Sequence, residues 1–82
     1  MMTIKILLFA QLKEKLNTSC WISALEQASL TQLQNTLVET FPEARSVIEA
    51  SRFAVNQAYV QDLSQAVSAQ DEIALIPPVS GG

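Results

Sequence analysis

The sequence predicts a small α+β domain in which a mixed sheet of four to five strands wraps around one main helix. Apolar segments with the two-residue period of strands lie toward both ends of the chain, and one helical stripe lies between them. The 82 residues form a single domain, because a second would leave neither half enough apolar surface to fold. Hydrophobic residues make up 49% of the chain and charged residues 16%, which favours a folded interaction domain over a disordered segment.

The first expected strand spans residues 3–9, which are rich in Ile, Leu and Phe. Such a composition is typical of a strand that is covered on both faces, or nearly so. Successive side chains of a strand point to opposite faces. One face therefore carries Ile4, Ile6 and Leu8, and the other carries Lys5, Leu7 and Phe9.

Residues 11–17 are polar enough to form a loop or a single helical turn that reverses the chain. Residues 19–25 then form the second strand, in which Cys20, Ile22 and Ala24 alternate with Trp21 and Ser23. Cys20 is the only cysteine and the chain has no histidine, which excludes disulfides, most zinc sites and histidine-based catalysis. A nucleophilic Cys20 is the alternative to the favoured interpretation, a small packed residue in an apolar strand.

The main helix is predicted from its cap and its stripe. Ser29 and Gln32 have the spacing of a capping box, in which the hydroxyl and the glutamine side chain satisfy free backbone amides of the first turn. Apolar residues then follow on one helical face: Leu30, Leu33, Leu37, Val38 and Phe41. Pro42 is expected to end this helix, and residues 43–51 to form a second, short helix.

Two short strands, 53–55 and 58–60, are expected on either side of Asn56 and Gln57, which are interpreted as a turn rather than a catalytic pair. Asp71 and Glu72 are interpreted as part of a solvated turn before the last strand, 72–76. A hairpin, a crossing helix and a returning strand beside the first make the β-grasp arrangement of ubiquitin. Element order alone does not separate it from other small α+β folds.

Charge and targeting features narrow the class of partner. The net charge is -3 and the five Lys and Arg residues form no stripe, which disfavours nucleic acid as a partner. The apolar run "IKILLFA" is too short for a signal peptide core and lacks a cleavage site. We therefore expect a cytoplasmic protein that does not bind membranes.

The sequence ends in Pro77-Pro78-Val79-Ser80-Gly81-Gly82, which we interpret as an arm, 77–82, on a domain formed by residues 1–76. Proline fixes its φ angle and stiffens the exit from the sheet, whereas glycine adds no side-chain bulk and can thread a narrow passage. The alternative is a frayed end behind two prolines that simply stop a strand.

Strand parity predicts an apolar patch near the base of this arm, on the sheet face opposite the helix. It consists of Leu7, Phe9, Tyr59 and Ile76. Scattered surface apolar residues are the alternative, and they are common. We favour an interface, because nothing else in this short chain covers that face.

Three stretches, "ILLFAQLKEKLN", "AVNQAYV" and "DEIALIPPVSGG", resemble the small subunits of molybdopterin synthase, sulfur carriers of the MoaD/ThiS family. The resemblance implies that Gly82 is adenylated by an ATP-using enzyme similar to ubiquitin-activating enzymes and converted to a thiocarboxylate. Its sulfur then passes to a pterin precursor on a large subunit, within a hetero-oligomer such as a heterotetramer. The active site is expected mainly on that subunit, so whether this chain counts as an enzyme stays open.

The resemblance also implies roles for individual residues. Gly81 threads into the partner's active site, and the partners dock on Phe9, Tyr59 and Ile76, with Leu7, Pro77, Pro78 and Val79 beside them. It implies no metal and no permanently bound cofactor, since the sulfur on Gly82 is transient.

The sequence departs from the family pattern at Gln70-Asp71, where Gly-Asp is frequent, and in "QDLSQAVSAQ", which lacks a charged or proline-marked loop. Two alternatives are kept. One is a sulfur carrier for thiazole or thiolated tRNA synthesis, although those relatives usually lack the two prolines. The other is a ubiquitin-like binding module with no chemistry at its end.

Overall fold

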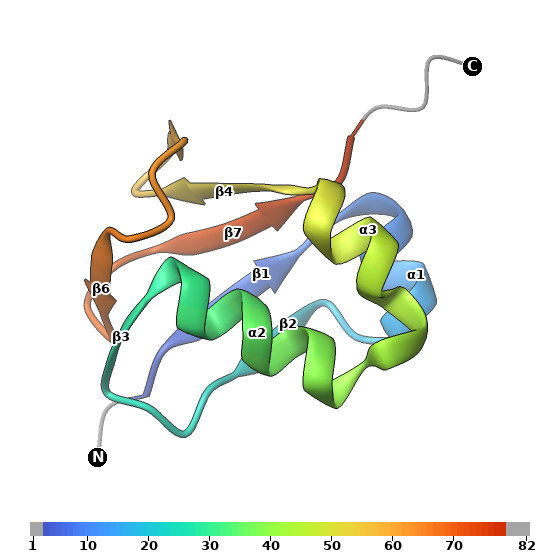
Figure 1. Cartoon of the computed structure of the whole chain (residues 1–82), viewed down its shortest axis with the longest axis horizontal. Helices are drawn as coiled ribbons and strands as arrows, with labels where there is room; N and C mark the ends of the chain where they lie inside the picture. The colour runs from blue at the N-terminus through green and yellow to red at the C-terminus, as the bar shows by residue number, and fades with distance from the viewer. Residues whose placement is uncertain (1–2, 79–82) are drawn as a thin grey trace.

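A five-stranded sheet packs on helix α2 (Leu30–Thr40) in the computed structural model, which describes residues 3–78 (Figure 1). The strand order is β2-β1-β7-β4-β5, and a separate ribbon pairs β3 with β6. The remaining bounds are β1 Lys5–Leu8, α1 Ala10–Leu16, β2 Cys20–Ile22, β3 Gln27–Ser29, η1 Pro42–Ala44, α3 Arg45–Ala50, β4 Arg52–Val55, β5 Ala58–Val60, β6 Ala66–Ser68 and β7 Ile73–Ile76.

The centre of the sheet is the parallel pair β1 and β7, which brings together the two ends of the domain. Ile6 lies beside Ile73 and Leu8 beside Leu75, and all four side chains are buried against α2. β2 adds antiparallel to β1, and β4 adds antiparallel to β7. The mixed sheet, the crossing helix and the last strand are as predicted.

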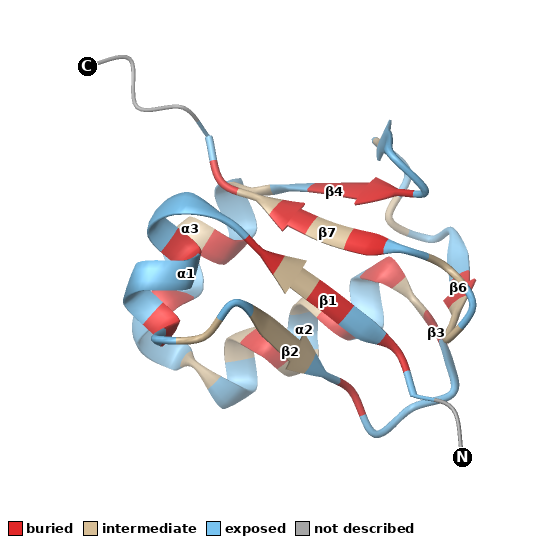
Figure 2. Ribbon diagram, turned by 180° about the vertical axis from the view of Figure 1, so that it is seen from behind, coloured by how far each residue is buried: buried red, intermediate tan, exposed pale blue. Residues whose placement is uncertain are grey.

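The first strand is shorter than expected and is covered on one face only. Ile4, Ile6 and Leu8 are buried, but Leu7 is half-buried and Phe9 is 45% exposed. The prediction of cover on both faces is therefore wrong for this chain. All of the main helix packs on one side, and Figure 2 shows the strands from the other side with α2 behind them.

Residues 11–17 form neither a loop nor a single turn, because α1 spans about two turns. Leu12 and Leu16 are four residues apart, so they lie on the same helical face, and both are buried. Asn17 ends the helix with a φ of 56° in the left-handed region. The prediction of a loop or a single turn was wrong because it rested on the many polar residues of this segment and not on the spacing of Leu12 and Leu16.

The second strand, expected over residues 19–25, is limited to Cys20–Ile22. Ser23 ends it: the serine is buried, its amide donates to the carbonyl of Ile4 (2.8 Å), and its Oγ accepts from the amide of Leu25 (3.0 Å). Trp21 packs against the core, whereas Cys20 is half-buried beside Leu7 on the other face.

The ribbon of β3 and β6 was not predicted. Each strand has three residues and a single buried apolar side chain, Ala28 in β3 and Val67 in β6. One apolar residue per strand gives no two-residue period, so the pattern was too short to indicate a strand.

The prediction for the main helix is confirmed. Ser29 Oγ accepts from the amide of Gln32 (3.2 Å), and Gln32 Oε1 accepts from the amide of Ser29 (2.9 Å). Leu30, Leu33 and Leu37 are fully buried, and the helix ends at Thr40, just before Phe41 and Pro42. The second helix is also present, as η1 followed by α3, close to the predicted range of 43–51.

Asn56 and Gln57 form the turn of the β4–β5 hairpin, as predicted, with φ angles of 53° and 70°. Asn56 also ties this turn to the one before β7. Its Nδ2 donates to Asp71 Oδ1 (3.1 Å) and its Oδ1 accepts from the amide of Glu72 (2.9 Å). Asp71 Oδ2 accepts in addition from the amide of Ser68 (2.8 Å).

These hydrogen bonds lower the pKa of Asp71 below its ordinary value, through the amide of Ser68 first and the side chain of Asn56 second. Donors that bond to a carboxylate stabilise its charged form. Asp71 therefore contributes stability at neutral pH, and that contribution is lost on acidification.

Leu33→Asp is expected to unfold the domain, because the new carboxylate would be buried without a partner in a small core that has few kcal/mol to spare. Asn35→Asp is the matched control, since Asn35 is exposed on the same helix and gains the same charge. Thermal melting followed by circular dichroism measures both. Equal melting of the two variants would show that the buried stripe is misassigned.

Asp71→Asn is expected to lower the Tm by a few degrees at neutral pH. Because the folded-state pKa is lowered, the difference from wild type is full above the unfolded pKa of about 3.9 and disappears as the pH falls below it. Thermal melts over this pH range test the expectation, with Glu72→Gln, which removes a neighbouring exposed charge, as control. Identical profiles for both variants would contradict it.

Candidate functional site

The sheet face opposite α2 carries the residues predicted to form the apolar patch. Directly paired residues of neighbouring strands point to the same face, and the pairs Leu7–Ala74, Ala74–Ala54 and Ala54–Tyr59 cross four strands. Ile76 follows Ala74 by two residues and shares its face. The two alanines lie in the middle of this row, where their small side chains leave the face hollowed.

A hollow of about 250 Å³ lies on this face. Its lining consists of Leu7, Phe9, Ala54, Gln57, Tyr59, Glu72, Ala74 and Ile76. We call this set the outer-face hollow. All four residues of the predicted patch line it, and Tyr59 is the most exposed of them, at 62%.

Sequence reasoning missed part of this lining. Ala74 has the same strand parity as Ile76, but neither Ala74 nor Ala54 was included in the predicted patch. Gln57 and Glu72 form the polar part of the lining. They lie in the two turns that Asn56 joins, and pairing between those turns could not be inferred from spacing along the chain.

The predicted arm leaves from the middle strand of the sheet. β7 lies between β1 and β4, and after Ile76 the chain continues as Pro77, which is buried, and Pro78, which is exposed (Figure 1). The predicted residues Val79, Gly81 and Gly82 lie outside the described residues. The fold thus brings the base of the arm next to the outer-face hollow, since Ile76 belongs to both.

A second hollow, of about 320 Å³, lies at the base of the arm. It is lined by Ala50, Arg52, Tyr59, Ile76, Pro77 and Pro78, and we call it the arm-base hollow. Tyr59 and Ile76 line both hollows, so the two are neighbours on the surface.

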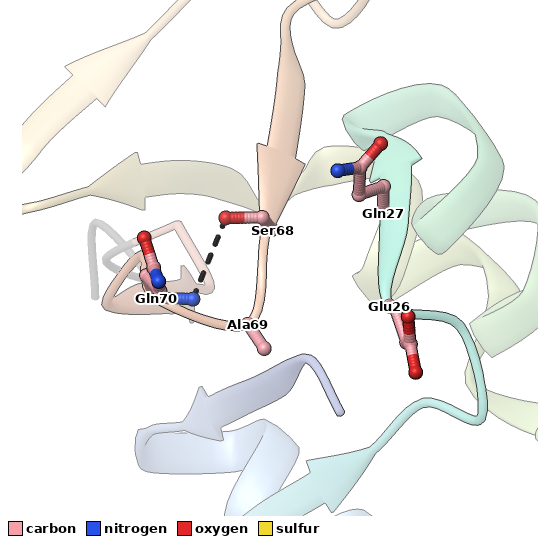
Figure 3. A pocket seen from close by; sticks show the side chains of 5 residues that line it. All are labelled: Glu26, Gln27, Ser68, Ala69 and Gln70. Atoms are coloured by element: carbon pink, nitrogen blue, oxygen red, sulfur yellow. Dashed lines mark hydrogen bonds between the residues drawn. The ribbon is translucent and has the colours of Figure 1, made fainter. Parts of the chain in front are cut away.

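A third hollow, of about 360 Å³, is polar and lies at the β3–β6 ribbon (Figure 3). Glu26 and Gln27 line it where β3 begins, and Ser68, Ala69 and Gln70 line it at the end of β6 and in the turn that follows. Ser68 Oγ accepts from the amide of Gln70 (3.4 Å). None of the predicted site residues lines it. Glu26, its one charged side chain, is exposed.

Within residues 3–78, no helix is long and apolar enough to cross a membrane. The same part of the chain contains no group of three or more His, Cys, Asp or Glu side chains that could hold a metal ion. What the described residues bring together is an apolar face and the two prolines at which the predicted arm begins.

Comparison with curated proteins finds relatives over almost the whole chain. The molybdopterin synthase sulfur carrier subunit of Dictyostelium discoideum is 42% identical over 81 residues, covering 95% of this chain and 94% of the relative. The subunit of the same name from Arabidopsis thaliana is 38% identical over 80 residues, covering 96% and 82%.

Solved structures share the fold. SAMP1 from Haloferax volcanii matches with a TM-score of 0.80 and 27% identity, over 98% of this chain and 99% of that one. A chain in the complex of subunits 1 and 2 of molybdopterin-converting factor from Helicobacter pylori matches with a TM-score of 0.70 and 20% identity, over 99% of this chain and 100% of that one. These likenesses confirm the predicted ubiquitin-like β-grasp fold.

The ThiS family model matches residues 6–82, which is nearly the whole sequence from the second residue of β1 onward. This match and the curated relatives agree with the resemblance found in the three stretches of sequence. The chain belongs to the ThiS family.

Proposed function

We propose that this chain is the sulfur carrier subunit of molybdopterin synthase and that Gly82 carries the sulfur. The observation that supports this most is the family match through Gly82, together with full-length relatives of that name. The geometry supports it as well, because the arm leaves the sheet beside an exposed apolar face that a partner can cover.

The proposed reaction starts from the α-carboxylate of Gly82, which is a poor electrophile and is ionised at neutral pH. One carboxylate oxygen attacks the α-phosphorus of ATP, pyrophosphate leaves, and a mixed anhydride with AMP is formed. A sulfide equivalent then attacks the carbonyl carbon and displaces AMP, which leaves a thiocarboxylate. Its sulfur is a soft nucleophile that can be passed to the pterin precursor.

Two partners take part in this proposal. An adenylyltransferase similar to ubiquitin-activating enzymes uses the ATP, and the large subunit of the synthase holds the precursor and most of the active site. This chain holds no cofactor permanently. The proposal places the hetero-oligomer in the cytoplasm, where the activating enzyme and ATP are available.

The arm suits delivery to two different active sites. Pro77 is buried, which fixes the base of the arm to the domain, and Pro78 restricts the next backbone angle. Gly81 and Gly82 have no side chains that would obstruct a narrow passage. The outer-face hollow supplies the area by which a partner holds the domain while the arm reaches in.

Phe9→Asp or Ile76→Asp is expected to weaken binding to the large subunit and to the activating enzyme at least about tenfold, because each carboxylate would be buried in an apolar contact. Leu25→Asp is the matched control, since Leu25 is exposed and lies outside both hollows, in the segment between β2 and β3. Titration with purified partners measures affinity, and circular dichroism checks the fold.

The docking prediction fails if both hollow variants bind as wild type does, or if Leu25→Asp weakens binding equally. In the first case the outer face is not an interface with these partners. In the second the effect is not specific to the hollow.

Deletion of Gly82, or addition of one alanine after it, is expected to abolish sulfur transfer and leave folding unchanged. Removing or adding one residue moves the terminal carbonyl carbon by up to about 3.6 Å along the chain. A shift of even about 1 Å can lower the rate on the order of a hundredfold. Gly81→Val is expected to be nearly as damaging, because a β-branched side chain fills the passage.

The assay reconstitutes the activating enzyme, ATP and a sulfide source, and detects thiocarboxylate by intact mass and then pterin product with the large subunit. Normal product formation by the shortened or extended chain would contradict the proposed function. If sulfur is transferred only with a partner from thiazole or thiolated tRNA synthesis, the chain is instead a sulfur carrier for that pathway. Partner binding without any sulfur would favour a binding module.

A further inference from the structure

The arm-base hollow contains one charged side chain, Arg52. Arg52 is the first residue of β4, and it pairs in register with Ile76, the last residue of β7, so the two ends meet where the arm begins (Figure 1). Arg52 is exposed, and its guanidinium carbon lies 6.0 Å from the centre of the Tyr59 ring. Contact with an aromatic face holds a guanidinium in place without neutralising it.

No carboxylate neutralises Arg52 in the part of the chain that is described. The one ion pair within residues 3–78 joins Arg45 to Glu49 on α3, with Nε and Oε2 3.2 Å apart. Lys5, Lys13 and Lys15 also have no ion pair in this part of the chain, so what distinguishes Arg52 is its position in the arm-base hollow. A cation at the arm base is available to a group from another molecule.

The other walls of the hollow are apolar or aromatic: Ala50, Tyr59, Ile76, Pro77 and Pro78. Such a lining accepts an aliphatic stem, while a guanidinium binds a planar anion through two parallel hydrogen bonds. A carboxylate on a short alkyl stem, as in glutamate or aspartate, meets both requirements. A nucleic acid backbone would need several cations, and the hollow has one.

We propose that the arm-base hollow binds an acidic side chain of the protein that receives the arm, and that Arg52 is a positioning residue for sulfur transfer. The inference rests on the proposed function, because it takes the partners from it. Arg52 lies about as close to the start of the arm as the sheet allows, since it neighbours Ile76. An ion pair there fixes the direction in which Pro78 and the following residues enter the partner.

The test compares Arg52→Met, which keeps the alkyl stem and removes the charge, with Lys15→Met as the matched control. Lys15 is exposed on α1, outside the sheet, and lines neither hollow. Arg52→Lys is the second variant, because it keeps the charge but loses the two-pronged geometry. Affinities for the purified large subunit and the purified activating enzyme are measured at low and high salt, with thermal melting as the fold control.

Arg52→Met is expected to bind at least one of the two partners about tenfold more weakly at low salt, with a smaller dependence on salt than wild type. Arg52→Lys should fall between Arg52→Met and wild type, and Lys15→Met should bind as wild type does. In the reconstituted assay the loss should persist at saturating partner as a lower rate of sulfur transfer, which a purely structural role would not give.

The inference is overturned if wild type binds its partners and Arg52→Met binds both with unchanged affinity and salt dependence. It is also overturned if Lys15→Met weakens binding as much, because the effect would then be one of general charge. If wild type binds neither partner and acquires no sulfur, the proposed function fails first and the inference falls with it.

Discussion

The parallel pairing of β1 with β7 is the contact on which the rest of this structure depends. It joins residues near the two ends of the chain, such as Ile6 and Ile73, so everything between them is closed into one long loop. Closing it costs chain entropy, which the burial of Leu30, Leu33 and Leu37 of α2 against the paired strands offsets. The pairing also makes the last strand the middle strand of the sheet, so the chain leaves the domain from its centre.

The exposed apolar face follows from the same arrangement. One main helix is enough to cover one side of the sheet, and the other side keeps Leu7, Tyr59 and Ile76 accessible beside the exit of the chain. In a free domain such a face is a liability for solubility, whereas in a complex it supplies binding area. Family membership and the position of this face therefore support one account, in which a partner covers the sheet while the arm reaches its active site.

Much of the fold could be predicted because long elements carry clear periods. The apolar stripe of α2 and its capping box, formed by Ser29 and Gln32, both indicate the same helix, which is eleven residues long. The elements that were not predicted are short or depend on partners distant in sequence. In α1, two buried leucines lie among polar residues, and in the β3–β6 ribbon each strand has one buried apolar residue. The candidate site, too, could be predicted only in part. Parity placed Tyr59 and Ile76 on the outer face, but the arm-base hollow needed the register that sets Arg52 beside Ile76.

The central claim is that Gly82 carries sulfur, and intact-mass measurement of the protein purified from its native host under mild conditions tests it most directly. The account predicts a fraction of molecules that is heavier than the sequence mass by the difference between one sulfur and one oxygen atom. Fragmentation should place that difference on Gly82, and it should disappear when the activating enzyme is deleted. A single species at the sequence mass, in cells that are making molybdopterin, would contradict the account.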